Sequence, residues 1–344
     1  MKEVLFYLVT DLHIDDSSGE LVKESLGEVF LEMVTNSVTT LIVSGDIFNF
    51  RKSQTLITTD YWGQILEEAN SHNIKVIAIP GNHDKMSYSS EKSYLDVFKY
   101  HPNFRLVRDT EMLRFDEVDV WLIPFFEEKE TYPKYLDKVD YKSLTSILIT
   151  HIAVNGVRNN DGTEIQDSLS KGRFKKFKHV FVGHYHDRQF IDNIVYVGSL
   201  MQRNFGEDQF KGITKVFSDG SYEFVDKEFQ VFETVRLNYS DTITDDLEKL
   251  SKVELSKKLK VRIILNGTKE EIDSLKKLQV MKVLDNSGFI MKSDYVSVDK
   301  VELESAESFT PFTKENLFVE WQEFAELNGI DTEQGNQVLK ALLE

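Results

Sequence analysis

The chain has 344 residues, a formal net charge of −17 and no cysteine, and 41% of its residues are hydrophobic. This composition excludes a disordered chain, disulfide bonds and cysteine zinc sites, and it leaves histidine, aspartate and asparagine as the available metal ligands. No apolar run approaches the roughly 18 residues of a membrane helix, and no basic-then-apolar leader precedes the first apolar run. We therefore expect a cytoplasmic protein with no membrane association.

The first 80 residues alternate between strand and helix patterns. Apolar runs of strand length occur at residues 4–9, 41–44 and 75–79. Amphipathic helices are predicted between them, over residues 19–35 and 54–71. This βαβαβ order predicts parallel strands joined by right-handed crossovers.

The next 150 residues continue the pattern with shorter elements. A short helix is predicted at residues 94–100. Further strands are predicted near residues 104–107, 118–123, 146–150, 179–183, 194–197, 213–217 and 222–225. Together with the N-terminal part they predict one layered α/β domain over residues 1–230.

The remaining residues have a different texture. Strands near residues 232–237, 259–265, 280–284 and 288–291 and helices near 245–250 and 268–278 predict a small α+β domain over residues 231–293. An acidic linker is expected at 294–310, followed by a helical segment at 311–344. Its first helix, 313–327, carries a face that includes Leu317, Phe318, Trp321 and Phe324. These side chains either fold back onto the chain or dock onto a partner.

Five of the predicted strands end in polar clusters. The clusters are Asp11-Leu12-His13, Gly45-Asp46, Gly81-Asn82-His83-Asp84, His151 and Gly183-His184-Tyr185-His186. Because ligands bind at the carboxyl ends of strands in open α/β sheets, we expect these side chains to meet at one edge of a sheet.

The clusters combine carboxylate, amide and imidazole groups. Oxygen and imidazole donors together suit Mn²⁺, Fe²⁺ or Zn²⁺. Two metals roughly 3.5 to 4 Å apart need a bridging carboxylate, and Asp46 is the natural candidate. The alternative is that each histidine is an ordinary core or surface residue, which is the interpretation we prefer for His72, His101 and His179.

The acidic net charge argues against nucleic-acid binding, which usually depends on surplus lysine and arginine. Local basic stretches nevertheless occur. They are Arg51-Lys52 and a run at residues 171–178 that contains Lys171, Arg173, Lys175, Lys176 and Lys178. The second run is either a phosphate-binding surface or a solvated helix with Phe174 and Phe177 turned inward.

The series of polar clusters resembles the calcineurin-like metallophosphoesterase superfamily. Two stretches are similar to the SbcD nuclease subunit family of recombination and double-strand-break repair complexes, and its bacteriophage members look closest. The first is Gly45-Asp46-Ile47-Phe48 with Arg51-Lys52, and the second is Thr150-His151-x-x-Val154-Asn155-Gly156. Residues 195–199 and the small domain also resemble that family, the latter its capping domain. The resemblance implies β-sheets sandwiched by helices.

The resemblance also implies roles for individual residues. One metal ion would be held by Asp11, His13, Asp46 and His186, and a second by Asp46, Asn82, His151 and His184. His83, oriented by Asp84, would stabilise the transition state or protonate the leaving oxygen. Asn49 departs from the family pattern, since relatives commonly carry Asp or His there, and an auxiliary role at that position is in question.

The function implied is a metal-dependent DNA phosphodiesterase, acting as an exonuclease on duplex ends and as an endonuclease on single strands. Its cofactors would be two divalent ions, Mn²⁺ first, with Mg²⁺, Fe²⁺ or Zn²⁺ as alternatives. Its partners would be DNA, an SbcC-type coiled-coil ATPase bound by the C-terminal helices, and a second copy bound through helices 19–35 and 54–71. The apolar stripes of these two helices could equally be buried within one subunit. The alternatives are a phosphoesterase acting on small nucleotides or phosphoproteins, and a catalytically silent DNA-end scaffold.

Overall fold

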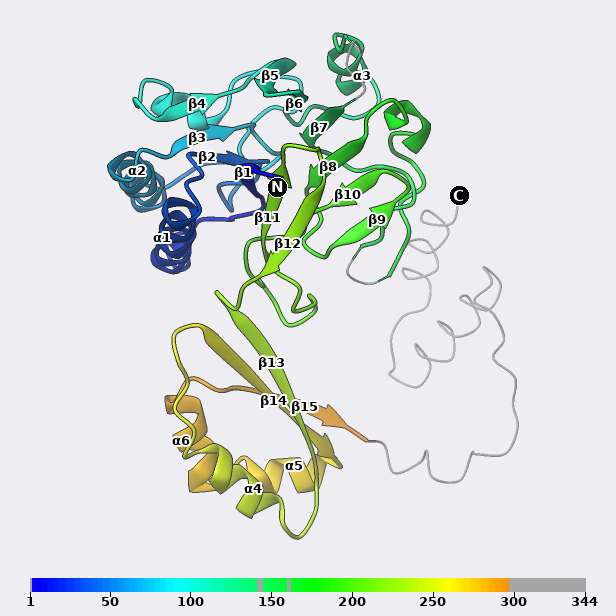
Figure 1. Cartoon of the computed structure of the whole chain (residues 1–344). Coiled ribbons are helices and arrows are strands. Elements are labelled where there is room, and N and C mark those ends of the chain that lie inside the picture. The colour runs from blue at the N-terminus through cyan, green and yellow to red at the C-terminus, as the bar shows by residue number, and fades with distance from the viewer. Residues whose placement is uncertain (1, 141–144, 160–161, 297–344) are drawn as a thin grey trace, which may run out of the picture. The chain divides into compact units, whose positions relative to one another are not determined.

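A computed structural model of the protein describes residues 2–140, 145–159 and 162–296. Two six-stranded sheets form its larger part (Figure 1). In spatial order, the first sheet contains β12 (Tyr222–Asp226), β11 (Gly212–Phe217), β1 (Val4–Val9), β2 (Thr40–Val43), β3 (Lys75–Ala78) and β4 (Phe104–Leu106). The second contains β5 (Glu111–Phe115), β6 (Val118–Ile123), β7 (Ser146–His151), β8 (His179–Gly183), β10 (Ile194–Tyr196) and β9 (Gln189–Ile191).

Parallel strands occupy the middle of each sheet. Strands β1 to β4 are parallel in the first sheet, and β6, β7, β8 and β10 are parallel in the second. Helix α1 (Gly19–Thr35) connects β1 to β2, and helix α2 (Leu56–Ser71) connects β2 to β3. The βαβαβ order predicted from the sequence is confirmed.

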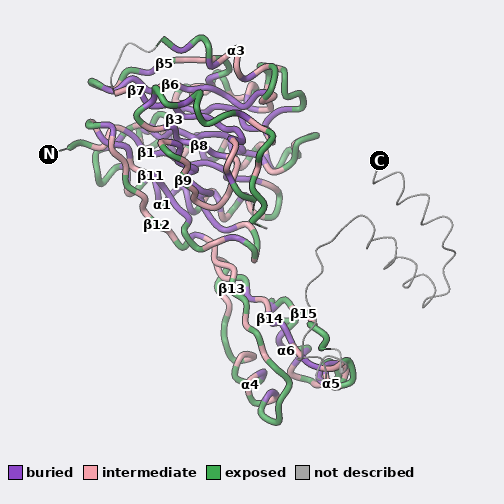
Figure 2. Tube along the Cα trace, turned by 90° about the vertical axis from the view of Figure 1, so that its right-hand side faces the viewer, coloured by how far each residue is buried: buried purple, intermediate pink, exposed green. Residues whose placement is uncertain are grey.

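Side-chain alternation along the strands produces a layered core. In β1, Tyr7 and Val9 pack with the buried side of α1 and α2, whereas Phe6 and Leu8 pack against the second sheet. The other face of the second sheet is covered by α3 (Tyr132–Leu136) and by side chains such as Phe174. Buried positions therefore gather along the strands of the two sheets (Figure 2). The layered α/β fold class is confirmed.

The sequence predicted that the five polar clusters lie at the edge of one sheet. This prediction is wrong, because they are divided between two sheets. Three of them follow strands of the first sheet, and two follow β7 and β8 of the second. The chain crosses between the sheets after β4, and the second sheet begins with the hairpin of β5 and β6. The sequence analysis did not predict β5, so it did not show that a second sheet begins there. The clusters meet because two sheets end at the same place.

Further elements differ from the prediction, including the short strand β9, which was not predicted. Residues 280–284 were expected to form a strand but lie in helix α6 (Gln279–Asn286). Val280 and Val283 favour strands, but Met281 and Leu284 bury one face at a helical spacing of three, and this packing outweighs local preference. Helix α3 was not predicted, because five residues are too few to show a period.

Residues 231–295 form a third sheet with its own core. Its strands are β13 (Val231–Asn238), β14 (Leu259–Gly267) and β15 (Ile290–Tyr295), and β13 and β14 are parallel. Helices α4 (Ile243–Leu250), α5 (Lys269–Leu275) and α6 pack with them around Leu247, Ile263 and Ile272. The predicted C-terminal helices, with Leu317, Phe318, Trp321 and Phe324, lie outside the described residues, as does the linker beyond residue 296.

In the part of the chain that the structure describes, no helix combines the length and the apolar character needed to cross a membrane.

Candidate metal centre

The loops after β1, β2 and β7 are tied together by hydrogen bonds. The amide of Asp11 donates to the carbonyl of Gly45 over 3.1 Å, and the amide of His13 donates to the carbonyl of Asp46 over 3.0 Å. Across the sheets, Nδ1 of His151 donates to the carbonyl of Ser44 over 2.8 Å. These bonds place the carboxyl ends of the two sheets together.

Several residues of this region have an unusual backbone conformation. Among the described residues, eight that are not glycine have a positive φ, and four of them are Asp11, His13, Asp46 and His184. Such conformations cost on the order of 1–3 kcal/mol each and persist only where the surrounding structure enforces them. Their concentration here is typical of a functional site.

Close backbone packing requires glycine in two of the loops. A Cβ atom at Gly81 would collide with the carboxylate of Asp46, and one at Gly183 would collide with the hydroxyl of Thr10. The glycines of the predicted clusters therefore allow the polar side chains to approach one another.

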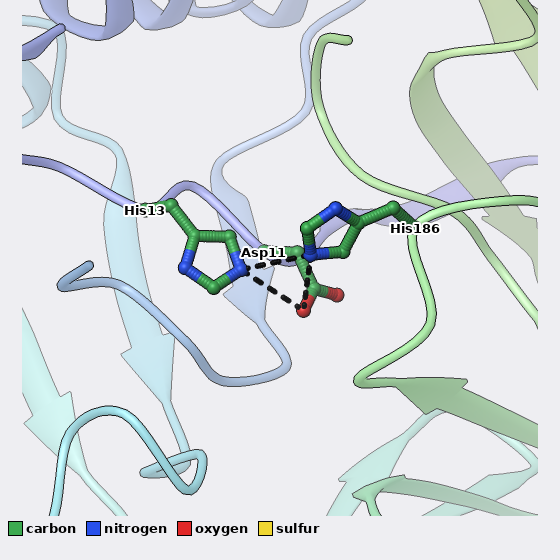
Figure 3. A group of neighbouring side chains, drawn as sticks. All are labelled: Asp11, His13 and His186. Carbon is green, nitrogen blue, oxygen red and sulfur yellow. Dashed lines mark hydrogen bonds and ion pairs between the residues drawn. The ribbon is translucent and has the colours of Figure 1, made fainter. Parts of the chain in front are cut away.

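Asp11, His13 and His186 form a first group of donor atoms (Figure 3). The two Nε2 atoms of the histidines lie 3.0 Å apart, and they lie 3.7 and 4.0 Å from Oδ1 of Asp11. Burial by itself raises the pKa of Asp11, but the neighbouring histidines outweigh burial and lower it to about 2. The group therefore offers one anionic oxygen and two imidazole nitrogens.

Asp46, Asn82, His151 and His184 form a second group. Nε2 of His151 lies 3.2 Å from Oδ2 of Asp46 and 3.1 Å from Oδ1 of Asn82. The same Asn82 oxygen lies 2.9 Å from Nδ1 of His184. Its donors are again hard oxygens and imidazole nitrogens.

The Asp46 carboxylate lies within reach of both groups. Its Oδ2 atom is 3.2 Å from His151 of the second group and 3.9 Å from His13 of the first. Burial raises the pKa of Asp46, but the charge and hydrogen bond of His151 hold it well below its usual range. This position and charge suit a carboxylate shared by two divalent ions, and the donor set as a whole fits such a pair.

Two histidines of the second group differ in their proton affinity. Burial lowers the pKa of His151, but the adjacent Asp46 carboxylate more than reverses this and raises it to about 9. Burial and the charge of His151 lower the pKa of His184 to about 4. At neutral pH His151 is therefore a doubly protonated, cationic imidazole, whereas His184 is neutral.

His83 lies beside the two groups but is not held by Asp84. Its Nδ1 atom donates to the carbonyl of Asn49 over 2.5 Å, and its Nε2 atom accepts from Arg51 over 3.1 Å. The Asp84 carboxylate accepts instead from the amides of Phe48 and Gly81. The prediction that Asp84 orients His83 is therefore wrong, and Asp84 fixes the backbone of two loops. Its burial, together with the Asp46 charge, raises its pKa to about 7.

Asn49, the position that departs from the family pattern, serves two neighbours. Its carbonyl holds His83, and its side-chain amide donates to Asp15 over 2.7 Å. Asp15 is half-buried and also accepts hydrogen bonds from the amides of Ser17 and Ser18.

The structure separates the two basic stretches. Arg51 reaches the centre through its bond to His83, and Lys52 follows it on the exposed surface. The run at 171–178 lies before the start of β8, whereas the centre lies after its end. A strand of five residues spans about 16 Å. In the run at 171–178, Phe174 and Phe177 are buried, as expected for a solvated surface segment with these two rings turned inward. The basic residues of the run are exposed, namely Lys171, Arg173, Lys175 and Lys176.

Glu207 belongs to the centre and was not predicted from the sequence. Its fully buried carboxylate accepts from Nδ1 of His186 over 2.8 Å, and this bond directs Nε2 of His186 toward Asp11. Carboxylates in this position fix the tautomer and orientation of metal-binding histidines. Glu207 lies 21 residues beyond His186 and outside any strand-end cluster, so no local pattern marks it.

Comparison with known proteins agrees with this geometry. The pattern of the family described as calcineurin-like phosphoesterase matches residues 4–188. This match includes every predicted metal ligand.

Distant similarity to known proteins includes the following three. Exonuclease subunit 1 of Enterobacteria phage T4 is 27% identical over 176 residues, which are 50% of this chain and 51% of the phage protein. DNA double-strand break repair protein Mre11 of Methanocaldococcus jannaschii is 26% identical over 325 residues, or 87% of this chain and 82% of that protein. Putative phosphoesterase 244L of Invertebrate iridescent virus 6 is 21% identical over 297 residues, which are 81% of this chain and 99% of the viral protein. The match to the phage protein thus spans about half of its length.

Proposed function

Because the chain belongs to the calcineurin-like phosphoesterase family, we propose that it is a metal-dependent DNA phosphodiesterase. The proposal includes exonuclease action on duplex ends and endonuclease action on single strands. Support for DNA as the substrate comes from the distant similarity to a phage exonuclease subunit and to a double-strand break repair protein.

The observation that carries the proposal is the position of Asp46 between two groups of oxygen and imidazole donors. Asp11, His13, Asp46 and His186 would hold one divalent ion, and Asp46, Asn82, His151 and His184 would hold the other. Two such ions clamp the attacking and leaving oxygens of a phosphoryl transfer. We propose Mn²⁺, with Mg²⁺, Fe²⁺ and Zn²⁺ as alternatives that metal analysis distinguishes.

Arg51 would bind the phosphate of the substrate, and His83 would transfer a proton to its leaving oxygen. In the structure Nε2 of His83 accepts a hydrogen bond from the Arg51 guanidinium and Nδ1 donates one to the Asn49 carbonyl, so the imidazole is neutral in this arrangement. An arriving phosphate attracts the guanidinium, since paired N–H donors match its oxygens. Nε2 of His83 would then be free to take up a proton from solvent and, as the imidazolium, to give it to the leaving oxygen.

Cleavage assays test this function against its alternatives. With Mn²⁺, the protein should cleave linear duplex DNA, hairpin DNA and bis-p-nitrophenyl phosphate. Hydrolysis of the small diester alone would favour a general phosphoesterase, and DNA binding without any hydrolysis would favour a silent scaffold. Asp46→Ala should abolish cleavage and lower the bound metal by more than one equivalent, because it removes a ligand of both ions. Unchanged metal content would contradict the shared carboxylate.

We further propose that the chain is an SbcD-type subunit, related to phage members, that acts as a homodimer with an SbcC-type ATPase. The division into a nuclease domain (1–230), a capping domain (231–293), a linker and a helical docking segment belongs to this proposal. Deletion from Ser308 onward should leave single-strand cleavage intact and abolish ATPase association and ATP-stimulated duplex digestion. Co-purification of the truncated protein with the ATPase would contradict the docking role.

A further inference from the structure

A small pocket opens beside the second group of donor atoms. Its volume is about 320 Å³, which is at the lower end for sites that bind small organic molecules. It is lined by Asn82 and His184, which belong to the second group of donor atoms, and by Arg51, Tyr88 and Phe125. A pocket of this size fits one nucleoside and not a duplex.

Two aromatic rings form one wall of the pocket. The Phe125 ring lies 5.0 Å from the Tyr88 ring, centroid to centroid, and 6.3 Å from the His184 ring, to which it is nearly parallel at 28°. Tyr88 is 37% exposed, so a ligand can reach it, and its hydroxyl accepts from Arg51 over 2.8 Å. Aromatic faces next to a cation are typical of sites that stack a nucleobase and bind the adjoining phosphate.

The wall is held in place before any ligand arrives. The amide of Phe125 donates to the carbonyl of Pro80 over 2.9 Å, and its carbonyl accepts from Nζ of Lys85 over 2.5 Å. Lys85 is 1% exposed and lies over the Phe126 ring at 3.7 Å. Burial lowers the pKa of Lys85 to about 7, but its amine can donate to the Phe125 carbonyl with or without the charge. A buried polar group is costly unless it is paired, so Lys85 holds this loop firmly. Little ordering remains for a ligand to impose, which favours binding.

Two carboxylates line the pocket as well. The Glu127 carboxylate accepts from the amides of Lys129 and Glu130, and these bonds lower its pKa. The Glu128 carboxylate accepts from the amide of Ala153 and the hydroxyl of Ser168. Both line the same pocket as the rings. Negative charge at this rim repels a second phosphate, so a nucleoside bound here suits the end of a strand.

We propose that this pocket binds the terminal nucleoside of a DNA strand, with its base against Tyr88 and Phe125 and its single phosphate at Arg51 and the metal centre. The proposal rests on the proposed nuclease function. It explains how the centre would select a strand end, and it assigns Tyr88, Phe125 and Glu127 to substrate selection.

Calorimetric titration tests base binding without relying on cleavage. The full chain with Mn²⁺ is titrated with thymidine 5′-monophosphate, thymidine 3′-monophosphate and inorganic phosphate. One of the two nucleotides should bind at least about tenfold more tightly than inorganic phosphate. Tyr88→Ala should weaken that nucleotide by roughly 5- to 150-fold, the range of one base–aromatic stack, and change the phosphate affinity less.

Two variants serve as controls. Tyr88→Phe keeps the ring and should retain most of the nucleotide affinity. Tyr100→Ala removes a tyrosine that is 86% exposed and does not line the pocket, and it should change neither affinity. Equal losses in Tyr88→Ala and Tyr100→Ala would overturn the assignment of Tyr88.

Thymidine 3′,5′-bisphosphate tests the selection of a strand end. It should bind more weakly than the preferred monophosphate, and Glu127→Gln should reduce this difference. A bisphosphate that binds as tightly as the monophosphate would overturn the terminal assignment. If the protein cleaves DNA but binds neither monophosphate more tightly than inorganic phosphate, only the pocket proposal fails. If it binds a monophosphate through Tyr88 but cleaves no DNA, only the nuclease proposal fails.

Discussion

The surroundings of His83 are compatible with two roles, a metal ligand and a proton-transfer group. Nε2 of His83 lies 4.0 Å from Oδ2 of Asp46, and together with His13 these residues form a third set of donors close enough to hold an ion. Its ring is nevertheless held by Asn49 and Arg51, outside the two groups that share Asp46. Geometry alone thus allows either a ligand or a proton-transfer group.

Replacing His83 by alanine distinguishes these roles. If His83 transfers a proton, the variant should lose roughly 10²- to 10⁴-fold in kcat while metal content and DNA affinity stay the same. Single-turnover cleavage and metal analysis of the same preparation measure both quantities. Loss of one metal equivalent would instead identify His83 as a ligand. His72→Ala, which changes a histidine at the end of α2, is the control.

Glu207 permits a second test at single-residue level. Glu207→Gln keeps the shape of the side chain but replaces a charged acceptor of the His186 proton by a weaker, neutral one. We expect the affinity for one of the two ions to fall about 10- to 100-fold. Competition with a fluorescent chelator measures this affinity. The matched control is Glu223→Gln on the exposed side of β12, and equal affinities in the two variants would contradict the role of Glu207.

Helices α1 and α2 lie side by side, and their predicted apolar stripes are used within one chain. Val22, Leu26 and Phe30 of α1 are fully buried in the core. Other apolar side chains of the two helices are exposed, namely Leu31 (58%), Val34 (49%), Leu56 (85%) and Ile57 (54%). If the protein dimerises through these helices, these exposed residues, and not the predicted stripes, form the interface.

A charge on this surface tests the proposed dimer. Wild-type protein should sediment with the mass of two chains, and Ile57→Glu should shift it to one chain, because a carboxylate cannot be buried unpaired at an apolar interface. Val97→Glu places the same charge on a residue that is 72% exposed outside both helices, and it should leave the mass unchanged. A wild-type monomer, or an Ile57→Glu dimer, would contradict the proposed interface.

The buried charges of the metal centre couple metal binding by the protein to pH. The chain carries a net charge of −17, and the carboxylates of Asp11 and Asp46 are buried among histidines. Without metal, Asp46 is neutralised in part by the proton on His151, whose pKa is about 9. A divalent ion at this place must displace that proton.

Metal binding should therefore release protons. Between pH 7 and 8 close to one proton per chain should come from His151, and none from His184, whose pKa of about 4 leaves it neutral already. A further fraction should come from His186, because the Glu207 hydrogen bond and the Asp11 charge outweigh burial and raise its pKa. Because His151 loses its proton as pH rises through 9, metal affinity should increase up to about that pH and then level off. Calorimetric titration with Mn²⁺ in buffers of different ionisation enthalpy measures the released protons. A heat that is independent of the buffer would contradict this prediction.

Local patterns in the sequence were sufficient to locate most of the strands and the side chains that we propose as metal ligands. Apolar runs of strand length and the polar clusters after them are features of adjacent residues, so Asp11, Asp46 and His151 could be identified without a structure. The same holds for α1 and α2, whose helical period extends over 17 and 16 residues. Helix α3 carries too few residues to show a helical period, and in β5 only Leu113 is buried, so no apolar run marks that strand.

Pairings between distant residues could be decided only by the tertiary structure. The His151 contact to Ser44 spans 107 residues and joins two sheets that the strand patterns had suggested were one. Likewise, the bonds of His83 to Asn49, of His186 to Glu207 and of Arg51 to Tyr88 depend on which loops the chain brings together. The period of a segment reveals which of its faces is buried, but it carries no information about which segment covers that face.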